Sequence, residues 1–370
     1  MTIKVFRSTD YGAPTNTNVA GSLISILDGV LVNGYGSQTA TISRSGQTVT
    51  VTVPVAHGLK SDTFVTIAGA TQTEYNGDFK ITVTGSSSFT YQCTGTPVTP
   101  ATGTITAKVA SAGWTKPFSG TNLAGYKQGA GSNGMYLRVN DAGTTTARIK
   151  ACESMTDING TVADFPTELQ ASGGLYVGKS GSGTCDWIAI ASEKFIYLFT
   201  QTNQNVNYRG TLFFGDIVSN KSGDAFNTMI VAGTNVTSYY NFDLFNLGSS
   251  LTQLTSHYIA RPHTQIGASL NNGKTSTVNM GNSSISMMGG AGISYPSPLD
   301  GALHLAPVLV TEQSVGMRGT MPNLWCPLHY KPFNHQDIID GSGQFAGKKF
   351  IALSGGYSTE YQCLIDISNG

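Results

Sequence analysis

The chain has 370 residues and a mass of 38.9 kDa, and its 21 Lys or Arg residues balance 21 Asp or Glu residues. Only 11% of residues are charged, whereas soluble proteins average about 25%. A neutral chain has no general field that attracts nucleic acid or an anionic membrane, and no run approaches the ~20 apolar residues of a membrane span. We therefore expect no nucleic-acid partner and no membrane insertion. The 45 Gly residues, together with many Thr and Ser residues, favour a folded, mainly β protein.

The first predicted element is one amphipathic helix. Between Gly21 and Val32 the apolar residues recur at spacings of three and four, which places them on one helical face. Gly34 follows, and glycine readily adopts the left-handed conformation that ends a helix. We expect about three turns that cover a sheet or a neighbouring subunit. The candidate core or interface residues of this helix are Leu23, Ile26, Leu27, Val30 and Leu31.

A period of two begins near Ser37. Apolar and polar residues alternate from Val49 to Val55, with Pro54 at the end of the run. Further strands are expected at 64–67, 79–83, 89–91 and 104–109, separated by links that contain Gly, Ser, Asn or Pro. This pattern predicts a small all-β sandwich or barrel at 37–109, inserted between an N-terminal segment 1–36 and a main body 110–370.

The body is predicted to be rich in β structure and rich in loops after about residue 250. Strands are expected at 136–139, 147–150, 212–214, 303–310 and 349–353. The best hairpin candidate joins 187–190 to 195–199, and both arms are nearly continuous apolar runs, as expected for strands buried on both faces. The candidate core or interface residues of the body are Trp114, Phe118, Trp187, Phe195, Tyr197 and Phe199.

Two segments resemble binding motifs. Residues 173–180 match the phosphate-loop spacing G-x-x-x-x-G-K-S, but Leu175 and Val177 suit a strand, and the following Gly and Ser residues do not start a helix. We interpret this segment as a strand that enters a Gly/Ser hairpin. Cys326, His329 and His335 form a C-x2-H-x5-H cluster that His304 could join, so zinc binding and a packed Pro-rich loop both stay open.

Other polar residues give no catalytic pattern. We expect His257 and His263 to lie at the surface or in an interface, and we expect reduced, buried thiols at all five cysteines, since they include no C-x-x-C pair. Acid–base pairs would need the fold to bring carboxylates together, and the basic residues look scattered rather than arranged in a stripe. The carboxylates are Asp141, Glu153, Asp157, Asp164, Glu168, Asp337 and Asp340; the basic residues are Arg138, Arg148, Lys150, Arg209, Lys221 and Lys274. We expect no enzymatic activity, no cofactor and no metal.

Several stretches together resemble the virion proteins of tailed bacteriophages. They lie at 4–6, 12–14, 20–24 and 31–36, and again at 113–118, 136–139, 147–148, 153–155 and 214–217. Between them, 56–59, 65–70, 75–77 and 101–105 look like a small β-module that is inserted into many phage structural proteins. The resemblance covers about residues 1–220. It implies a structural component of the neck, tail or baseplate, located in the virion after synthesis in the bacterial cytoplasm, and it implies no reaction.

Two functions follow as expectations. The first is a structural subunit that packs in a ring or other symmetric assembly with copies of itself and with other phage structural proteins. The second is an adhesin that binds a host-surface receptor or glycan through the module or the C-terminal loops, where exposed aromatic side chains would stack on sugars.

Overall fold

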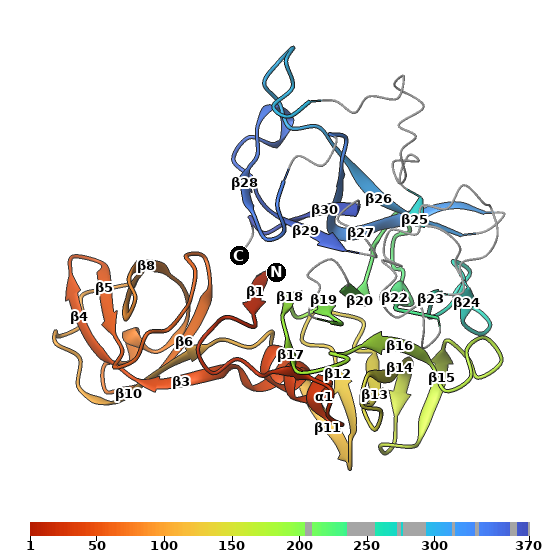
Figure 1. Ribbon diagram of the computed structural model, residues 1–370, viewed down its shortest axis with the longest axis horizontal. Coiled ribbons are helices and arrows are strands. Elements are labelled where there is room, and N and C mark those ends of the chain that lie inside the picture. Colours follow the sequence, from red (N-terminus) through yellow and green to blue (C-terminus); the bar gives the residue numbers. More distant parts are fainter. Residues whose placement is uncertain are drawn as a thin grey trace.

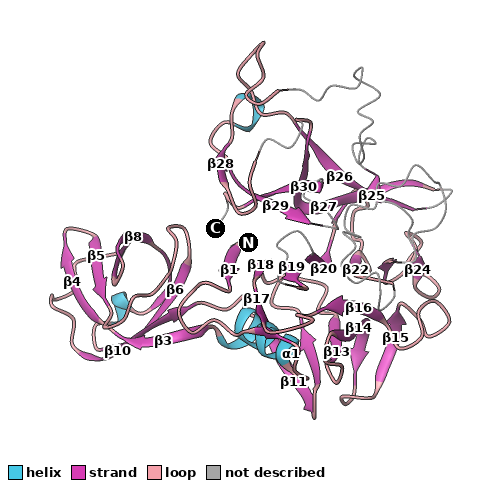
Figure 2. Cartoon of the chain, in the orientation of Figure 1, coloured by secondary structure: helices cyan, strands magenta, loops and turns pink. Residues whose placement is uncertain are grey.

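The structure is a computed structural model that describes residues 1–203, 209–234, 256–271, 275–276, 294–312, 315–329, 333–355 and 361–368. With 49% of residues in strands and 6% in helical conformation, the protein is mainly β, and the predicted fold class is confirmed. Figures 1 and 2 show the arrangement: the strands of residues 35–109 project to one side of a larger body.

A seven-stranded antiparallel sheet forms the centre of the body and is buried on both faces. Its strands, in spatial order, are β1 (Lys4–Arg7), β18 (Trp187–Ala191), β19 (Phe195–Gln201), β20 (Arg209–Asp216), β22 (Thr228–Val231), β23 (His257–Ile259) and β24 (Leu270–Asn271). One face packs on a second sheet and the N-terminal helix, and the other face packs on a third sheet.

The second sheet consists of β11 (Thr115–Gly120), β12 (Leu123–Lys127), β13 (Tyr136–Asn140), β14 (Thr146–Met155) and β15 (Thr161–Phe165), and β16 (Leu175–Gly178) also pairs with β14. The third consists of β25 (Thr275–Ser276), β26 (Leu305–Glu312), β27 (Gly316–Pro327), β30 (Tyr361–Asp366), β29 (Lys349–Gly355) and β28 (Ile338–Asp340). The short strand β21 (Val218–Ser219) pairs with β27, and β2 (Asn16–Thr17) pairs with β17 (Thr184–Cys185).

The β18–β19 hairpin shows why both of its strands are unbroken apolar runs in the sequence. Every residue of the two strands is buried. Side chains such as Ala189 and Leu198 pack toward the second sheet, whereas their neighbours Ile190 and Tyr197 pack toward the third. The prediction of a hairpin buried on both faces is therefore confirmed. Its aromatic candidates lie in the core of this chain: Trp187, Phe195, Tyr197 and Phe199.

The predicted helix runs from Ser22 to Asn33 but changes its winding halfway. Ser22–Leu27 (α1) is α-helical, and Asp28–Asn33 continues as a wider π-helical segment. Gly34 ends the helix at φ +67°, and a Cβ there would lie 2.1 Å from the carbonyl oxygen of Val109, so only glycine fits. The five apolar candidates of the helix are almost fully buried in the core that the helix shares with the central sheet and the second sheet, which we call the first core: Leu23, Ile26, Leu27, Val30 and Leu31.

Residues 35–109 form a module with a hydrophobic core of its own, drawn from positions 42–107. One sheet contains β3 (Tyr35–Thr39), β10 (Gly103–Val109), β6 (Phe64–Ala70) and β7 (Gly77–Lys80); the other contains β4 (Thr41–Ser45), β5 (Thr48–Thr52), β9 (Ser88–Gln92) and β8 (Thr82–Gly85).

Two details of the module differ from the sequence-based expectation. Val55 is 48% exposed, because β5 ends at Thr52 and the alternation no longer follows a strand. The single strand expected at 79–83 is two strands, since the chain passes at Ile81 from the sheet of β7 to the sheet of β8.

Ion pairs hold the module against the body in addition to the two connecting strands. The Lys4 ammonium in β1 lies 2.7 Å from the Asp78 carboxylate of the module. On another side, the Lys349 ammonium in β29 lies 2.9 Å from Asp62, which also pairs with Lys80 at 3.2 Å. The module is thereby fixed to both the N-terminal strand and the third sheet.

Acidification should loosen this attachment. Burial alone would raise the pKa of Asp62 and of Asp78, but hydrogen bonds from their lysine partners outweigh it and lower both pKa values. A carboxyl group whose folded pKa is depressed stabilises the fold above its unfolded pKa of about 4, and that stability is lost as the pH falls through the folded pKa. Each pair is partly exposed, so its contribution is at most ~1 kcal/mol.

Distance distributions between one spin label on the module and one on the body should therefore be narrow at neutral pH and broader near ~pH 3. A Lys4→Met/Lys349→Met variant should already be broad at neutral pH and change little with acid. An unchanged distribution in both cases would contradict the role of these pairs.

Candidate functional site

The lysine of the phosphate-loop-like segment holds a buried ion pair. Lys179 follows strand β16, and its ammonium lies 2.5 Å from Asp141, with further bonds to two backbone carbonyls. Asp141 in turn accepts hydrogen bonds from the amides of Leu23 (2.7 Å) and Ile24 (3.1 Å) at the start of α1. The interpretation of the segment as a strand is confirmed. Lys179 binds the carboxylate that holds the first amides of α1.

The histidines considered as zinc ligands form hydrogen bonds with backbone amides. His329 accepts a hydrogen bond from the backbone amide of His304, and His335 accepts one from a backbone amide of β29. Burial raises the pKa of the Cys326 thiol to about 12, so this thiol stays protonated at neutral pH. In the part of the chain that the structure describes, no group of three or more His, Cys, Asp or Glu residues is placed to hold a metal ion.

The expectation that His257 lies at the surface or in an interface is wrong. This residue begins β23 inside the central sheet and is fully buried, and its burial lowers the pKa to about 3. His263 lies in the loop after β23 with 42% of its side chain exposed. All five cysteines are buried thiols outside any disulfide, as predicted.

The carboxylates named as acid–base candidates serve structural contacts. Glu153 binds Arg261 with both oxygens, at 2.5 and 2.7 Å. Asp164 pairs with Lys150 at 2.5 Å. The carboxylates of Asp157, Glu168 and Asp337 accept hydrogen bonds from backbone amides nearby in the chain. They therefore stabilise local turns. Asp340 lies at the end of β28.

The basic residues are less scattered than the sequence suggests. Arg138 and Lys150 lie directly opposite each other on β13 and β14, and Arg148 follows on β14 with its guanidinium 3.9 Å from the Tyr176 ring centroid. Arg209 is buried, so the expectation of a scattered surface charge is wrong for this residue. Burial lowers the pKa of its guanidinium to about 10. Lys274 lies outside the described residues.

The two aromatic candidates at the start of the body differ in burial. Trp114 is buried in the first core, and its indole nitrogen donates to the carbonyl of Ser192 at 2.7 Å. Phe118, on the edge strand β11, is only half-buried and lies 6.3 Å from the ring of Tyr136. Trp114 is therefore a core residue, whereas Phe118 reaches the surface.

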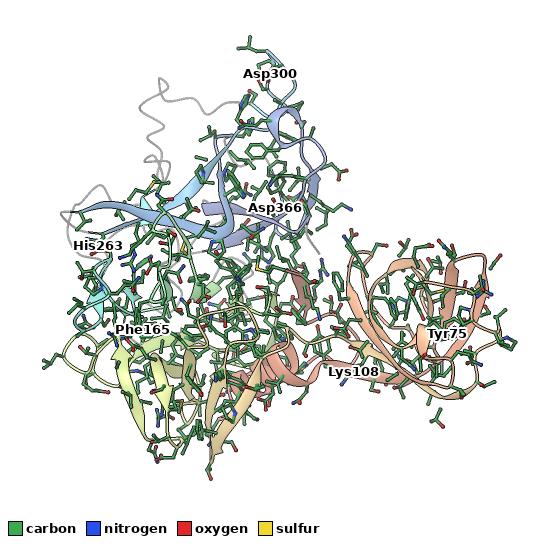
Figure 3. The ribbon with its side chains drawn as sticks, turned by 180° about the vertical axis from the view of Figure 1, so that it is seen from behind. Tyr75, Lys108, Phe165, His263, Asp300 and Asp366 are labelled. Carbon is green, nitrogen blue, oxygen red and sulfur yellow. The ribbon has the colours of Figure 1, made fainter. Side chains whose placement is uncertain are left out.

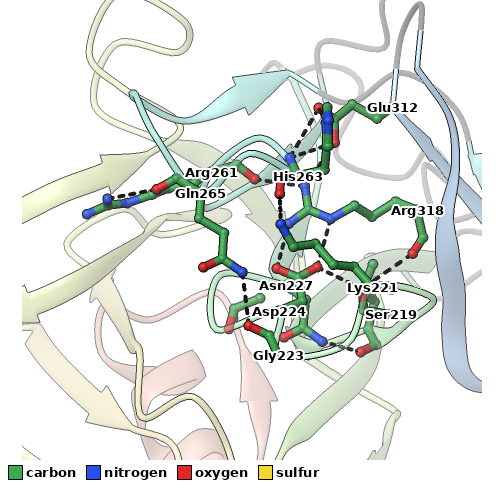
Figure 4. A network of polar contacts seen from close by, with 12 residues as sticks. Ser219, Lys221, Gly223, Asp224, Asn227, Arg261, His263, Gln265, Glu312 and Arg318 are labelled. Atoms are coloured by element: carbon green, nitrogen blue, oxygen red, sulfur yellow. Dashed lines mark hydrogen bonds and ion pairs between the residues drawn. The ribbon is translucent and has the colours of Figure 1, made fainter.

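A buried charge network supports the tip of the β26–β27 hairpin (Figure 4). Arg318, near the start of β27, donates from Nε and Nη2 to the Asp224 carboxylate, both at 2.8 Å. Its Nη1 donates to Glu312, at the end of β26, and to the carbonyl of Arg261, each at 2.9 Å. The side chains of Arg318, Asp224 and Glu312 are at most 4% exposed. Three separate segments thus meet on one guanidinium.

The loop after β23 is fastened to the same network. The backbone amide of His263 donates to both oxygens of Glu312, at 3.2 and 3.0 Å, and its ring Nδ1 lies 2.9 Å from one of them. Lys221 donates to the carbonyl of His263, and Gln265 donates to the carbonyl of Gly223 at 2.9 Å. The loop and the hairpin therefore form one firm base.

A pocket of about 260 Å³ opens at this base. It is lined by Asn220, Lys221, His263, Glu312, Val315, Gly316, Met317 and Arg318. Because Glu312 and Arg318 bind each other, the other polar side chains of the lining are those of Asn220, Lys221 and His263. The Lys221 ammonium is exposed, whereas the His263 ring lies 2.9 Å from Glu312 through Nδ1. The pocket therefore offers the Lys221 ammonium as a donor above a pre-formed, hydrogen-bonded floor.

Apolar side chains surround this pocket. Val315 is 57% exposed and Met317 50%, both at the hairpin tip, and Val218 of the paired strand β21 is 57% exposed. Ile266, next to Gln265 in the fastened loop, is 78% exposed. Val315 and Met317 line the pocket, and Val218 and Ile266 lie on segments next to it. Exposed apolar groups beside a pocket are typical of a protein-binding surface. We name these four residues together with the pocket the hairpin surface.

No protein-family model matches the chain, and no curated protein matches it. Within the described ranges, no helix is long and apolar enough to cross a membrane.

Proposed function

We propose that this protein is a structural subunit of a tailed-bacteriophage particle, in the neck, tail or baseplate region, and that it acts by binding copies of itself and neighbouring structural proteins. The observation that carries the proposal is the hairpin surface, with exposed Val218, Ile266, Val315 and Met317 around a pocket on a firm base. Assignment to a phage particle rests on the sequence resemblance over residues 1–220.

Physical reasoning favours binding at this surface. Apolar area removed from water contributes roughly 25 cal/mol per Å², and side chains that are already held in place lose less conformational entropy on binding. The Arg318 network supplies that rigidity, since it ties the hairpin to the segments at Asp224 and at His263. The low charge of the chain adds little long-range repulsion between copies.

Substitution of the hairpin tip tests the proposal. Val315→Glu or Met317→Lys should reduce incorporation into particles, because each places a charge where an apolar contact forms. Loss of one central contact of about 2 kcal/mol corresponds to roughly 30-fold weaker binding. Incorporation is measured by quantifying this protein in purified particles after complementation of a deletion.

Val98→Glu is the matched control, since Val98 is 71% exposed on the module, away from the hairpin. It should be incorporated normally. Normal incorporation of both hairpin variants would overturn the use of this surface, and absence of the wild-type protein from particles would overturn the proposed function as a whole.

A further inference from the structure

Strand β26 connects an exposed turn to the hairpin pocket. Before its start at Leu305 lies a turn at 297–301 that is exposed at 298–301, and at its other end, Glu312, lies the hairpin pocket. Eight residues of extended chain span about 26 Å at ~3.3 Å each. Figure 3 shows Asp300 at the top of the view and His263 well below it, at the left edge. The turn and the pocket therefore cannot meet within one copy.

The turn presents one apolar and one acidic side chain to solvent. Leu299 is 97% exposed, and half of the Asp300 side chain is exposed. The turn is held by a bond from the Gly301 amide to the Ser297 carbonyl, at 2.8 Å. Hydrogen bonds from the Ser297 side chain and the Ala302 amide lower the pKa of Asp300, so its carboxylate is ionised at neutral pH.

The hairpin pocket is complementary to this pair of side chains. The exposed Lys221 ammonium is a charged hydrogen-bond donor and suits a carboxylate. Val315 and Met317 at the rim of the pocket suit an aliphatic side chain. The pocket volume of about 260 Å³ far exceeds the ~30 Å³ share of one water molecule, so a side chain can enter.

We propose that the Leu299–Asp300 turn of one copy enters the hairpin pocket of a second copy, with Leu299 against Val315 and Met317 and with Asp300 paired to Lys221. This inference rests on the proposed function and names the occupant of its binding surface. A single contact leaves one turn and one pocket unused, and a two-fold dimer fills both when each copy inserts its turn into the other. The alternative is a head-to-tail contact that repeats. Repetition then closes a ring or extends a filament.

A charge exchange tests the contact in purified full-length protein. Asp300→Lys and Lys221→Glu should each weaken self-association at least about tenfold, because each places like charges together. The combined variant Asp300→Lys/Lys221→Glu should regain association, since the pair is re-formed with its charges reversed. Sedimentation velocity across a wide range of concentration measures the species formed, and wild-type protein should form dimers or larger species.

Folding and specificity are controlled separately. Both positions are exposed, so circular dichroism should match wild type for all three variants. Their unfolding midpoints should fall only slightly, since Lys221 loses its bond to the His263 carbonyl and Asp300 loses its bonds within the turn. Lys60→Glu, at an exposed lysine of the module, should associate like wild type.

Two results would overturn the inference: a wild-type protein that stays monomeric, or a combined variant that does not re-associate. If the charge variants associate like wild type while Val315→Glu still blocks incorporation into particles, the inference fails and the proposed function stands. If Val315→Glu is also incorporated normally, both fail.

Discussion

Replacement of Arg318 with methionine should lower the free energy of unfolding by about 3 to 5 kcal/mol, because it removes the cation from a buried network. Asp224 and Glu312 would remain as two carboxylates that are at most 4% exposed and have lost their guanidinium. Burial by itself raises the pKa of Asp224, and the Arg318 hydrogen bonds reverse this and lower it. The variant lacks these hydrogen bonds, so the uncompensated carboxylates of Asp224 and Glu312 destabilise the fold.

Companion variants separate charge from geometry. Arg318→Lys keeps the charge but loses the planar fork that binds Asp224 with two bonds, so its stability should lie between those of wild type and Arg318→Met. Asp224→Asn/Arg318→Met/Glu312→Gln removes all three charges and should recover part of the loss. Urea denaturation measures each free energy of unfolding, and Lys60→Met, at an exposed lysine, is the control.

Hydrogen exchange shows where the change acts. In Arg318→Met, the amides of the hairpin tip and of His263 should exchange faster, because the His263 amide donates to Glu312, which Arg318 holds in place. A loss of stability below ~1 kcal/mol, with unchanged exchange at His263, would show that the network does not support the hairpin surface.

The local elements of the fold could be predicted from the sequence. The helix at Ser22–Asn33 and the hairpin at Trp187–Gln201 depend on the spacing of nearby apolar residues, and this spacing is visible in the chain itself. The π-helical half was not predictable, because its apolar stripe has the same positions as an α-helix. The burial of His257 was not predictable either, since it depends on where β23 lies in the central sheet.

The hairpin surface escaped the sequence-based reasoning for a different reason. Asp224, His263, Glu312 and Arg318 come from segments that are up to 94 positions apart, and no local spacing connects them. One weak signal existed. In a chain with 11% charged residues, Arg318 interrupts a strand that carries Met317 and Met321, and a charge in such a strand needs a buried partner. The identity of that partner depends on the fold.

The second large effect is expected at Lys179. Its side chain is 1% exposed and that of Asp141 is fully buried, so Lys179→Met leaves an unpaired carboxylate in the interior. We expect a loss of about 3 to 5 kcal/mol in the free energy of unfolding. Burial raises the pKa of Asp141, while the ion pair with Lys179 and the amides of Ile24 and Leu23 oppose this rise. Without the lysine, protonation of Asp141 becomes the favoured state, so the variant should regain stability as the pH falls.

The matched variant decides between a pair that stabilises helix α1 and a lysine that binds a ligand. In Asp141→Asn/Lys179→Met the interior carries no charge, and the side-chain oxygen of the introduced asparagine can still accept from the amides of Leu23 and Ile24, so most of the lost stability should return. A role of Lys179 in phosphate binding predicts the opposite: a modest loss in Lys179→Met and no recovery in the double variant. Urea denaturation of the two variants distinguishes these outcomes, because only a buried pair couples the two substitutions.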